Sequence, residues 1–193
     1  MSLINRIEAA LELGFARSEG RSAPPRLMAA MRQAVFPGGA RIRPQLCLAV
    51  ANACGEDDAA LSDAAAAAIE LLHCASLVHD DMPCFDDADT RRGQATVHKA
   101  YGEPLALLTG DALIILAYQI LAQSGRQHPM RMVQLMSAIS DGVGAPDGIV
   151  AGQAWECESR VELTQYQRAK TGALFVAATC AGALAAGVDP APW

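Results

Sequence analysis

The stretch AAAAAIELLHCASLVHDD, residues 64–81, decides the fold. Up to residue 78 it is apolar around almost its whole circumference, and it ends in two adjacent aspartates. A helix that is apolar all round is buried, so we expect this one at the centre of a bundle. The alanine run 64–68 is expected where a neighbouring helix approaches closely. Polar groups on such a helix then point into the bundle.

The rest of the chain also follows the helical period of 3.6 residues, and strand-like alternation is absent. The expected helices are residues 2–17, 25–35, 44–53, 62–81, 104–124, 128–140, 150–157 and 164–187. Gly and Pro punctuate them, and Thr164 with Gln167 has the pattern of a capping box. The sequence therefore predicts an all-α fold. Because no linker or repeat divides the chain, it predicts one domain over residues 1–193.

Composition and charge exclude several classes of protein. The formal net charge is −6, from 15 Lys and Arg against 21 Asp and Glu, which argues against nucleic acid as a partner. The six cysteines form no CxxC pair and no secretory leader precedes them, so we expect a reduced, cytoplasmic protein. The apolar run 172–188 is mostly Ala and Gly and lacks basic or aromatic anchors. We therefore expect a buried helix there and no transmembrane segment.

The segment HDDMPCFDDADTRRG, residues 79–93, carries the chemistry. Asp80 and Asp81 fall at the carboxyl end of a predicted helix, where the helix dipole disfavours anions, so a cation must compensate. Mg²⁺ takes one or two carboxylates and completes its shell with water and substrate phosphates. Pro83 interrupts the helix, which allows a turn that brings Asp80 and Asp86 together.

The two arginines that follow suit the anion to which such a metal bridges. Arg91 and Arg92 carry guanidinium groups, which bind phosphate oxygens bidentately. A solvated acidic turn is the simplest alternative. An EF-hand fails, because a loop begun at Asp80 has Met82 at its third position and Phe85 where glycine is needed. The segment thus favours a site for Mg²⁺ and a diphosphate.

Motifs in order along the chain resemble those of the trans-isoprenyl diphosphate synthases. Residues 80–92 resemble the family's first aspartate-rich motif in its longer bacterial spacing, and residues 38–44, GGARIRP, resemble its Gly-Gly-Lys-Arg-x-Arg-Pro segment. His73 matches a family histidine that helps to hold isopentenyl diphosphate. Residues 170–172, KTG, and 110–113, GDAL, match two further elements. The pattern is most similar to that of bacterial geranylgeranyl diphosphate synthases.

The resemblance implies an all-α isoprenoid-synthase bundle with a central cavity, usually a homodimer. It implies a Mg²⁺-dependent prenyltransferase that joins isopentenyl diphosphate to an allylic diphosphate (dimethylallyl, geranyl or farnesyl), in isoprenoid and carotenoid biosynthesis. The residues implied are Asp80 and Asp86 for Mg²⁺; Arg91, Lys170 and Thr171 for the allylic diphosphate; and Arg43, His73 and Arg92 for isopentenyl diphosphate. No protein nucleophile is needed, because the metal and cationic side chains stabilise the departing diphosphate.

The resemblance also implies what sets the product length. In this family, bulk on the helix below the first aspartates blocks the growing tail, and the position five residues before the first aspartate is informative. Ala75 stands there with Ser76 beside it, about 7.5 Å of helix rise below Asp80. Both residues are small, so we expect an open pocket and geranylgeranyl diphosphate as the product.

Two departures from the family pattern leave alternatives open. Ala40 stands where the family has lysine, and we expect Arg41 to take over that contact with isopentenyl diphosphate. The sequence ends at Trp193, before the family's second aspartate-rich motif and the helices of the far wall, so we expect a fragment of a longer synthase. The alternative is a non-catalytic or partner-dependent subunit of a heteromeric synthase. A class I terpene cyclase is less consistent, because it needs no second diphosphate site.

Overall fold

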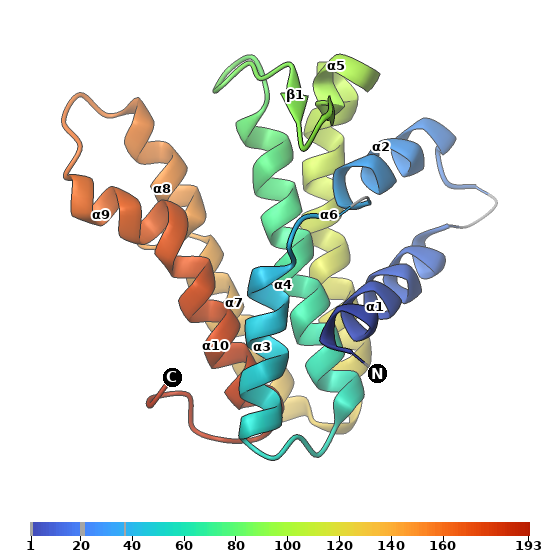
Figure 1. The fold of residues 1–193 in the computed structure, drawn as a ribbon, viewed down its shortest axis with the longest axis vertical. Helices are drawn as coiled ribbons and strands as arrows, with labels where there is room; N and C mark the ends of the chain where they lie inside the picture. Colours follow the sequence, from blue (N-terminus) through green and yellow to red (C-terminus); the bar gives the residue numbers. More distant parts are fainter. Residues whose placement is uncertain (1, 20–21, 37) are drawn as a thin grey trace.

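The computed structural model describes residues 2–19, 22–36 and 38–193, and it is built almost entirely from helices (Figure 1). The longer helices are α1 (Leu3–Ser18), α2 (Pro25–Val35), α3 (Ile42–Ala53), α4 (Ala59–Asp80), α6 (Glu103–Ser124), α7 (Pro129–Val143) and α10 (Ala173–Ala185). The shorter ones are α5 (Val97–Tyr101), α8 (Ile149–Ala154) and α9 (Leu163–Gln167), with 3-10 turns at Gly125–Gln127 and Trp155–Cys157 and a π-helical turn at Arg168–Gly172. The predicted all-α class is confirmed.

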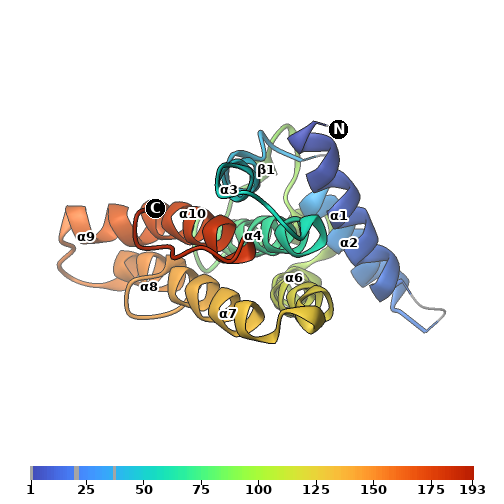
Figure 2. The ribbon, with the colours of Figure 1, turned by 90° about the horizontal axis from the view of Figure 1, so that it is seen from below.

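The helix α4 lies at the centre of the bundle, as its apolar sequence predicts. Seen from below, it is surrounded by α1, α3, α6 and α10 (Figure 2), and its most extensive packing is against α6. Every alanine from 64 to 68 is at most 3% exposed. Five consecutive residues point in all directions around a helix, so the run lies in contacts on every side of α4.

The apolar run near the carboxyl end forms α10, and the expectation of a buried helix there is confirmed. Most of its small residues are buried against α3, α4 and α7. Gly182 lies so close to α3 that a Cβ atom on it would overlap with the backbone carbonyl of Cys47. The glycine therefore lets these two helices approach more closely than any side chain would allow.

Among the described residues, two helical stretches are long and apolar enough to cross a membrane. They are α4 and the segment Glu103–Gln127, which begins with α6. In α4, 78% of the apolar window is buried inside the bundle, which is the property of a core helix, whereas the value for the second segment is 44%. The helix α6 therefore keeps an apolar outer side, on which Leu108 and Ile115 are each about half exposed.

The segment between α4 and α6 differs from the prediction. β1 (Thr90–Arg91) and β2 (Gln94–Ala95) form an antiparallel hairpin. Its two turn residues, Arg92 and Gly93, have φ angles of 54° and 80°, which match the turns whose twist suits a two-residue hairpin. Two residues are too few for alternation to show in a sequence, so the prediction of no strands is wrong here. The five-residue α5 is likewise absent from the predicted helices.

The single helix predicted over residues 164–187 consists of three pieces. A π-helical turn at Arg168–Gly172 separates α9 from α10, and such turns are frequent at functional sites. The predicted capping box at Thr164 is wrong. Glu162 is the N-cap of α9, and its carboxylate accepts hydrogen bonds from the backbone N–H groups of Thr164 and Gln165. A carboxylate there satisfies two orphan donors at once, so the helix begins one residue earlier.

Candidate active site

The turn that follows α4 gathers the acidic segment. The backbone N–H of Asp86 donates to the carbonyl of Asp80 at 3.0 Å, and that of Ala88 donates to the carbonyl of Asp81 at 3.2 Å. The chain therefore folds back on the end of α4 directly after Pro83, as the sequence predicts. Asp80 and Asp86 therefore start from neighbouring backbone positions although they are six positions apart in the sequence.

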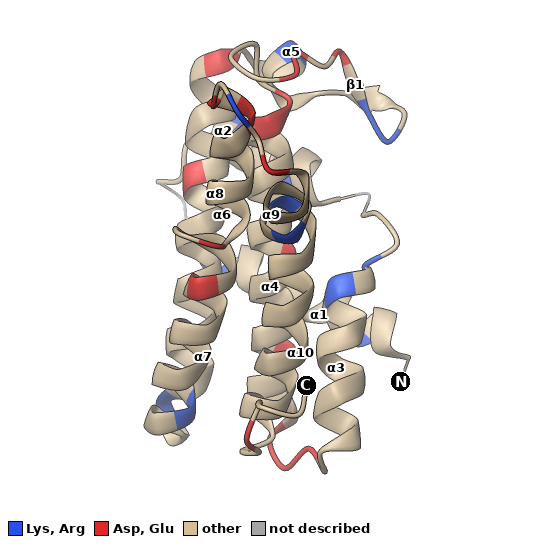
Figure 3. Ribbon diagram, turned by 90° about the vertical axis from the view of Figure 1, so that its left-hand side faces the viewer, with Lys and Arg blue, Asp and Glu red and all other residues tan. Residues whose placement is uncertain are grey.

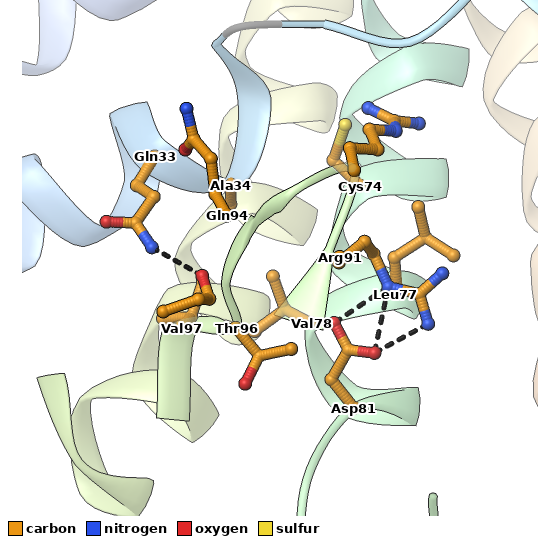
Figure 4. Close-up of a pocket in the computed structure, with 12 residues that line it drawn as sticks. Gln33, Ala34, Cys74, Leu77, Val78, Asp81, Arg91, Gln94, Thr96 and Val97 are labelled. Atoms are coloured by element: carbon orange, nitrogen blue, oxygen red, sulfur yellow. Dashed lines mark hydrogen bonds and ion pairs between the residues drawn. The ribbon is translucent and has the colours of Figure 1, made fainter. Parts of the chain in front are cut away.

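Asp81 is bound by an arginine rather than directed at a ligand. It is 4% exposed, and Nε of Arg91 donates to its carboxylate oxygens at 2.8 Å, beside a small pocket of about 50 Å³ (Figure 4). This hydrogen-bonded pair raises the pKa of Arg91. Arg91 thus supplies the cation that the helix dipole requires at the carboxyl end of α4.

Asp87 and Asp89 are held by α5 and the residues around it. Nζ of Lys99 lies 3.1 Å from Oδ1 of Asp87 and 3.0 Å from Oδ1 of Asp89. The buried His98 places its Nε2 3.4 Å from the same oxygen of Asp87. The hydrogen bond from Lys99 holds the pKa of Asp87 below its usual value. These contacts fix the outer half of the acidic loop.

Asp80 and Asp86 are the carboxylates of the segment that fit Mg²⁺. The ion pairs of Asp80 are long, 3.4 Å to Lys170 and 3.8 Å to Arg91, and within the described ranges Asp86 forms none. Over the same ranges no group of three or more His, Cys, Asp or Glu side chains converges on one point. Mg²⁺ is usually held by one or two carboxylates and keeps its other positions for water and substrate phosphates. Two carboxylates on one turn suit that donor set.

Lys170 reaches Asp80 from the π-helical turn. A Cβ atom on Gly152 would overlap with the backbone of Lys170, so this glycine lets α8 lie directly against the turn. Nζ of Lys170 lies 2.5 Å from Oε1 of Glu156 as well as 3.4 Å from Asp80. Thr171 is exposed, and its side chain makes no hydrogen bond to another described residue. Neither Gly152 nor Glu156 belongs to a motif named in the sequence analysis, so both residues were missed.

Arg43, His73 and Arg92 form a group near the π-helical turn, which we call the cationic wall. Nη1 of Arg43 donates to Nε2 of His73 at 3.3 Å, which leaves the imidazole proton on Nδ1, because a guanidinium can only donate. Burial and then the charges of Arg43 and Arg92 lower the pKa of His73 to about 3, so the ring is neutral at pH 7. The Arg43 guanidinium lies 4.3 Å from the ring centre of Phe175, and its buried Nε has no hydrogen-bond partner among the described residues.

The two glycines of the GGARIRP segment make room for arginine side chains. A Cβ atom on Gly38 would overlap with the guanidinium of Arg41, and one on Gly39 would lie 2.6 Å from Nη2 of Arg92. The glycine pair therefore serves the positions of two cations that lie far apart in the sequence. This close packing gives a physical reason for the two glycines of the motif, which the sequence pattern alone does not give.

Arg41 does not replace the lysine that is missing at Ala40, so that expectation is wrong. Its side chain is 1% exposed and binds Glu8 at 2.8 Å and Glu70 at 2.6 Å. A third hydrogen bond runs from Nη2 to the backbone carbonyl of Val35 at 2.9 Å. The guanidinium is buried and fully engaged inside the bundle, so none of it is directed at a ligand.

An apolar cavity of about 430 Å³ adjoins the aspartate turn. Met82 and Phe85 of the turn line it, together with Ala75 and Ser76 of α4. The other walls come from α6, α7 and α8. Its volume lies within the range of roughly 300–1,000 Å³ that is usual for ligand pockets. Charged groups that suit a diphosphate thus lie beside a cavity that suits a hydrocarbon chain.

Comparisons with known proteins agree with this geometry. The chain is 58% identical over its 193 residues to the geranylgeranyl diphosphate synthase of Cereibacter sphaeroides and 55% identical to that of Rhodobacter capsulatus, and it covers 67% of the length of each. The structure of an FPP/GFPP synthase from Zymomonas mobilis matches with a TM-score of 0.84 and 37% identity over 97% of this chain and 72% of that one. A geranyltransferase from Legionella pneumophila matches with a TM-score of 0.84 and 33% identity, over 94% of this chain and 66% of that one.

The family itself is shown by a match to a family sequence model. The model for polyprenyl synthetase matches residues 24–192, which is most of the chain and includes every predicted site residue. The resemblance and the isoprenoid-synthase fold inferred from the motifs are confirmed by this match and by the relatives. This chain belongs to the polyprenyl synthetase family.

Proposed function

We propose that this protein is a prenyltransferase that condenses isopentenyl diphosphate with an allylic diphosphate and makes geranylgeranyl diphosphate. The observation that carries the proposal is the junction of the aspartate turn with the apolar cavity, because Met82 and Phe85 belong to both. The relatives named as geranylgeranyl diphosphate synthases support the same product. The chain covers about two thirds of their length.

The charged side chains divide between two diphosphates in this proposal. Asp80 and Asp86 hold Mg²⁺. Arg91, Lys170 and Thr171 bind the allylic diphosphate. Isopentenyl diphosphate is bound by the cationic wall, in which Arg43 and Arg92 supply charge and neutral His73 supplies the Nδ1–H donor.

Catalysis then needs no protein nucleophile. When bound, Mg²⁺ stabilises the negative charge that develops on the departing diphosphate. Arg91 and Lys170 are positioned to stabilise the same charge, and the cavity lining excludes water from the allylic cation. The double bond of isopentenyl diphosphate attacks that cation, and the proton released afterwards leaves with the departed diphosphate.

Ala75 and Ser76 are proposed to admit the growing chain. Both line the cavity, Ala75 is 1% exposed, and the hydroxyl of Ser76 is turned away to donate to the carbonyl of His73 at 2.8 Å. The test is an assay with radiolabelled isopentenyl diphosphate and each allylic starter, followed by chromatography of the products. The wild type should make C20, and Ala75→Tyr should stop at C15. An unchanged product from the mutant would remove Ala75 from the tail pocket.

The same assay decides between this proposal and the non-catalytic alternative. Turnover by the protein alone, abolished by EDTA and restored by Mg²⁺, supports a synthase. No turnover alone, with activity restored only by an added partner synthase, supports a subunit of a heteromeric enzyme. A cyclic product made without isopentenyl diphosphate supports a terpene cyclase.

A homodimer is the assembly that we propose. The outer side of α6 supports it, because Leu108 and Ile115 are exposed and line an apolar groove of about 520 Å³ against Met28 and Met31 of α2. Sedimentation at several concentrations should give twice the chain mass, and Ile115→Asp should give a monomer. A cytoplasmic location and a single domain over residues 1–193 stay predictions.

A further inference from the structure

We infer that Glu156 is a positioning residue that holds the ammonium group of Lys170 beside Asp80. The inference rests on the proposed function, in which Lys170 binds the allylic diphosphate. Glu156 lies in the 3-10 turn that follows α8, and Lys170 lies in the π-helical turn that follows α9, so the contact joins two separate elements (Figure 1). Figure 3 shows a basic segment, coloured blue, beside α9.

The carboxylate of Glu156 is fixed by three donors. Its Oε1 accepts from Nζ of Lys170 at 2.5 Å and from the hydroxyl of Tyr166 at 2.5 Å. Its Oε2 accepts from the side-chain amide of Gln153 at 3.1 Å. The Tyr166 ring also lies 5.9 Å from the same ammonium. Glu156 is thus held on both oxygens, and a held carboxylate can hold a flexible lysine in turn.

The charges agree with this geometry. Burial raises the pKa of Glu156, but the hydrogen bonds from Lys170 and Tyr166 outweigh it and leave that pKa below its usual value. Burial likewise opposes the charge of Lys170, and Glu156 and Asp80 outweigh it, so its pKa is raised. Both partners are therefore charged at neutral pH.

The position of the ammonium matters because two carboxylates compete for it. It lies 2.5 Å from Glu156 and 3.4 Å from Asp80. A lysine has a flexible four-carbon stem and loses rotamer entropy when it is ordered. Without Glu156, the anion of the described residues that remains within reach is Asp80, and a closer pair there would occupy the carboxylate proposed for Mg²⁺. Glu156 therefore both orders Lys170 and keeps it from closing on Asp80.

The experiment compares Glu156→Gln with Glu158→Gln, an exposed carboxylate directly after the same turn. The Michaelis constants for geranyl diphosphate and for isopentenyl diphosphate are measured separately, together with the calorimetric Kd of inorganic diphosphate in MgCl₂. We expect E156Q to raise the KM for geranyl diphosphate and this Kd about tenfold, because a tenfold loss is what one ordered charged contact of about 1.4 kcal/mol gives. The KM for isopentenyl diphosphate, the unfolding midpoint and all values for E158Q should stay within about twofold of the wild type.

A double-mutant cycle shows whether Glu156 acts through Lys170. In a Lys170→Met background, Glu156→Gln should have no further effect on the Kd of diphosphate. An undiminished effect there, or an equal rise in both Michaelis constants with a lower unfolding midpoint, would overturn the inference. A wild type that binds diphosphate without prenyl transfer contradicts the proposed function alone, and the cycle still decides the role of Glu156. An active wild type with an unaltered diphosphate Kd in E156Q contradicts only this inference.

Discussion

Two arginines that are two residues apart in the sequence lie in opposite electrostatic surroundings. Arg41 is enclosed by the bundle, with Glu8 and Glu70 at 2.8 and 2.6 Å. Arg43 lies against Phe175 and donates to a neutral histidine, and burial lowers its pKa. In the first region the protein neutralises its own charge, whereas in the second region it leaves the positive charge without a carboxylate at hydrogen-bond distance among the described residues.

The difference shows which cations serve the fold and which serve a ligand. Burying a charge costs free energy unless a partner of opposite charge compensates. The surroundings of Arg41 meet that requirement from within the chain. Arg43 is only half-buried and has no carboxylate partner among the described residues, so it is open to an anion from outside, and a diphosphate has the charge and the acceptors for that contact. Both residues are arginines in the same short motif, so only their contacts in the structure distinguish the two roles.

Removing Arg41 should have the largest effect, and the effect should be on stability. Arg41→Met leaves Glu70, whose side chain is 2% exposed, as an uncompensated buried anion. Loss of one partner of such a pair costs about 3–5 kcal/mol. Urea unfolding should show a loss of this size, and the double variant with Glu70→Gln should recover part of it. A loss below about 1 kcal/mol would contradict the assignment of Arg41 to the fold.

Removing Arg43 should instead affect binding. Arg43→Met deletes charged hydrogen bonds to the bound anion, each worth about 1.5–3 kcal/mol, so the KM for isopentenyl diphosphate should rise roughly 10- to 100-fold. Urea unfolding should change little, because no carboxylate loses its partner. The KM for the allylic substrate serves as the control. If both Michaelis constants rose equally, Arg43 would not distinguish the two diphosphate sites.

The cationic wall should also leave a signature in the pH dependence of stability. The pKa of His73 is about 3 in the folded protein, below the value of 6.5 for an unperturbed histidine. The unfolded chain therefore binds a proton that the folded chain excludes, and stability falls as the pH falls from about 6.5 towards 3. Burial and the charges of Arg43, Arg92, Arg91 and Arg41 all exclude that proton.

The comparison of wild type with His73→Gln isolates this term. Between pH 6.5 and 5.0 the wild type should lose about 1.5 kcal/mol more unfolding free energy than H73Q, as linkage gives for a shift of this size. Carboxylates that titrate in the same window contribute equally to both proteins. Parallel pH profiles would show that His73 is protonated in the folded state and that the wall carries less positive field than its geometry indicates.

The helices were largely predictable because burial leaves a periodic pattern. Residues 25–35 match α2 at both ends, and residues 104–124 match α6 to within one residue. The start of α4 was predicted too late, because Asp58 caps it and its carboxylate accepts from the N–H groups of Ala60 and Leu61. A cap followed by alanines carries no apolar periodicity. Element type therefore follows from pattern, whereas the ends depend on single hydrogen bonds.

The site was predictable in part. The turn that joins Asp80 to Asp86 follows from Pro83, and the contact of Arg43 with His73 fits the roles that the family resemblance implies. The burial of Arg41 was not foreseen, because its partners lie 29 and 33 residues away in the sequence and no local pattern links them. Long-range ion pairs of this kind leave no periodic trace.

The smallest effect should come from restoring a cation at Ala40. This residue is exposed and its carbonyl accepts from the side chain of Gln45 at 2.7 Å, so a longer side chain fits without repacking. An exposed ion pair is worth about 0.2–1 kcal/mol, so Ala40→Lys should lower the KM for isopentenyl diphosphate by up to about fivefold. Added salt should reduce the gain, and Ala40→Gln, which has length without charge, should show none. If both variants bound equally well, the wall at Arg43 would already neutralise its diphosphate, and the lysine missing at Ala40 would have no electrostatic role to restore.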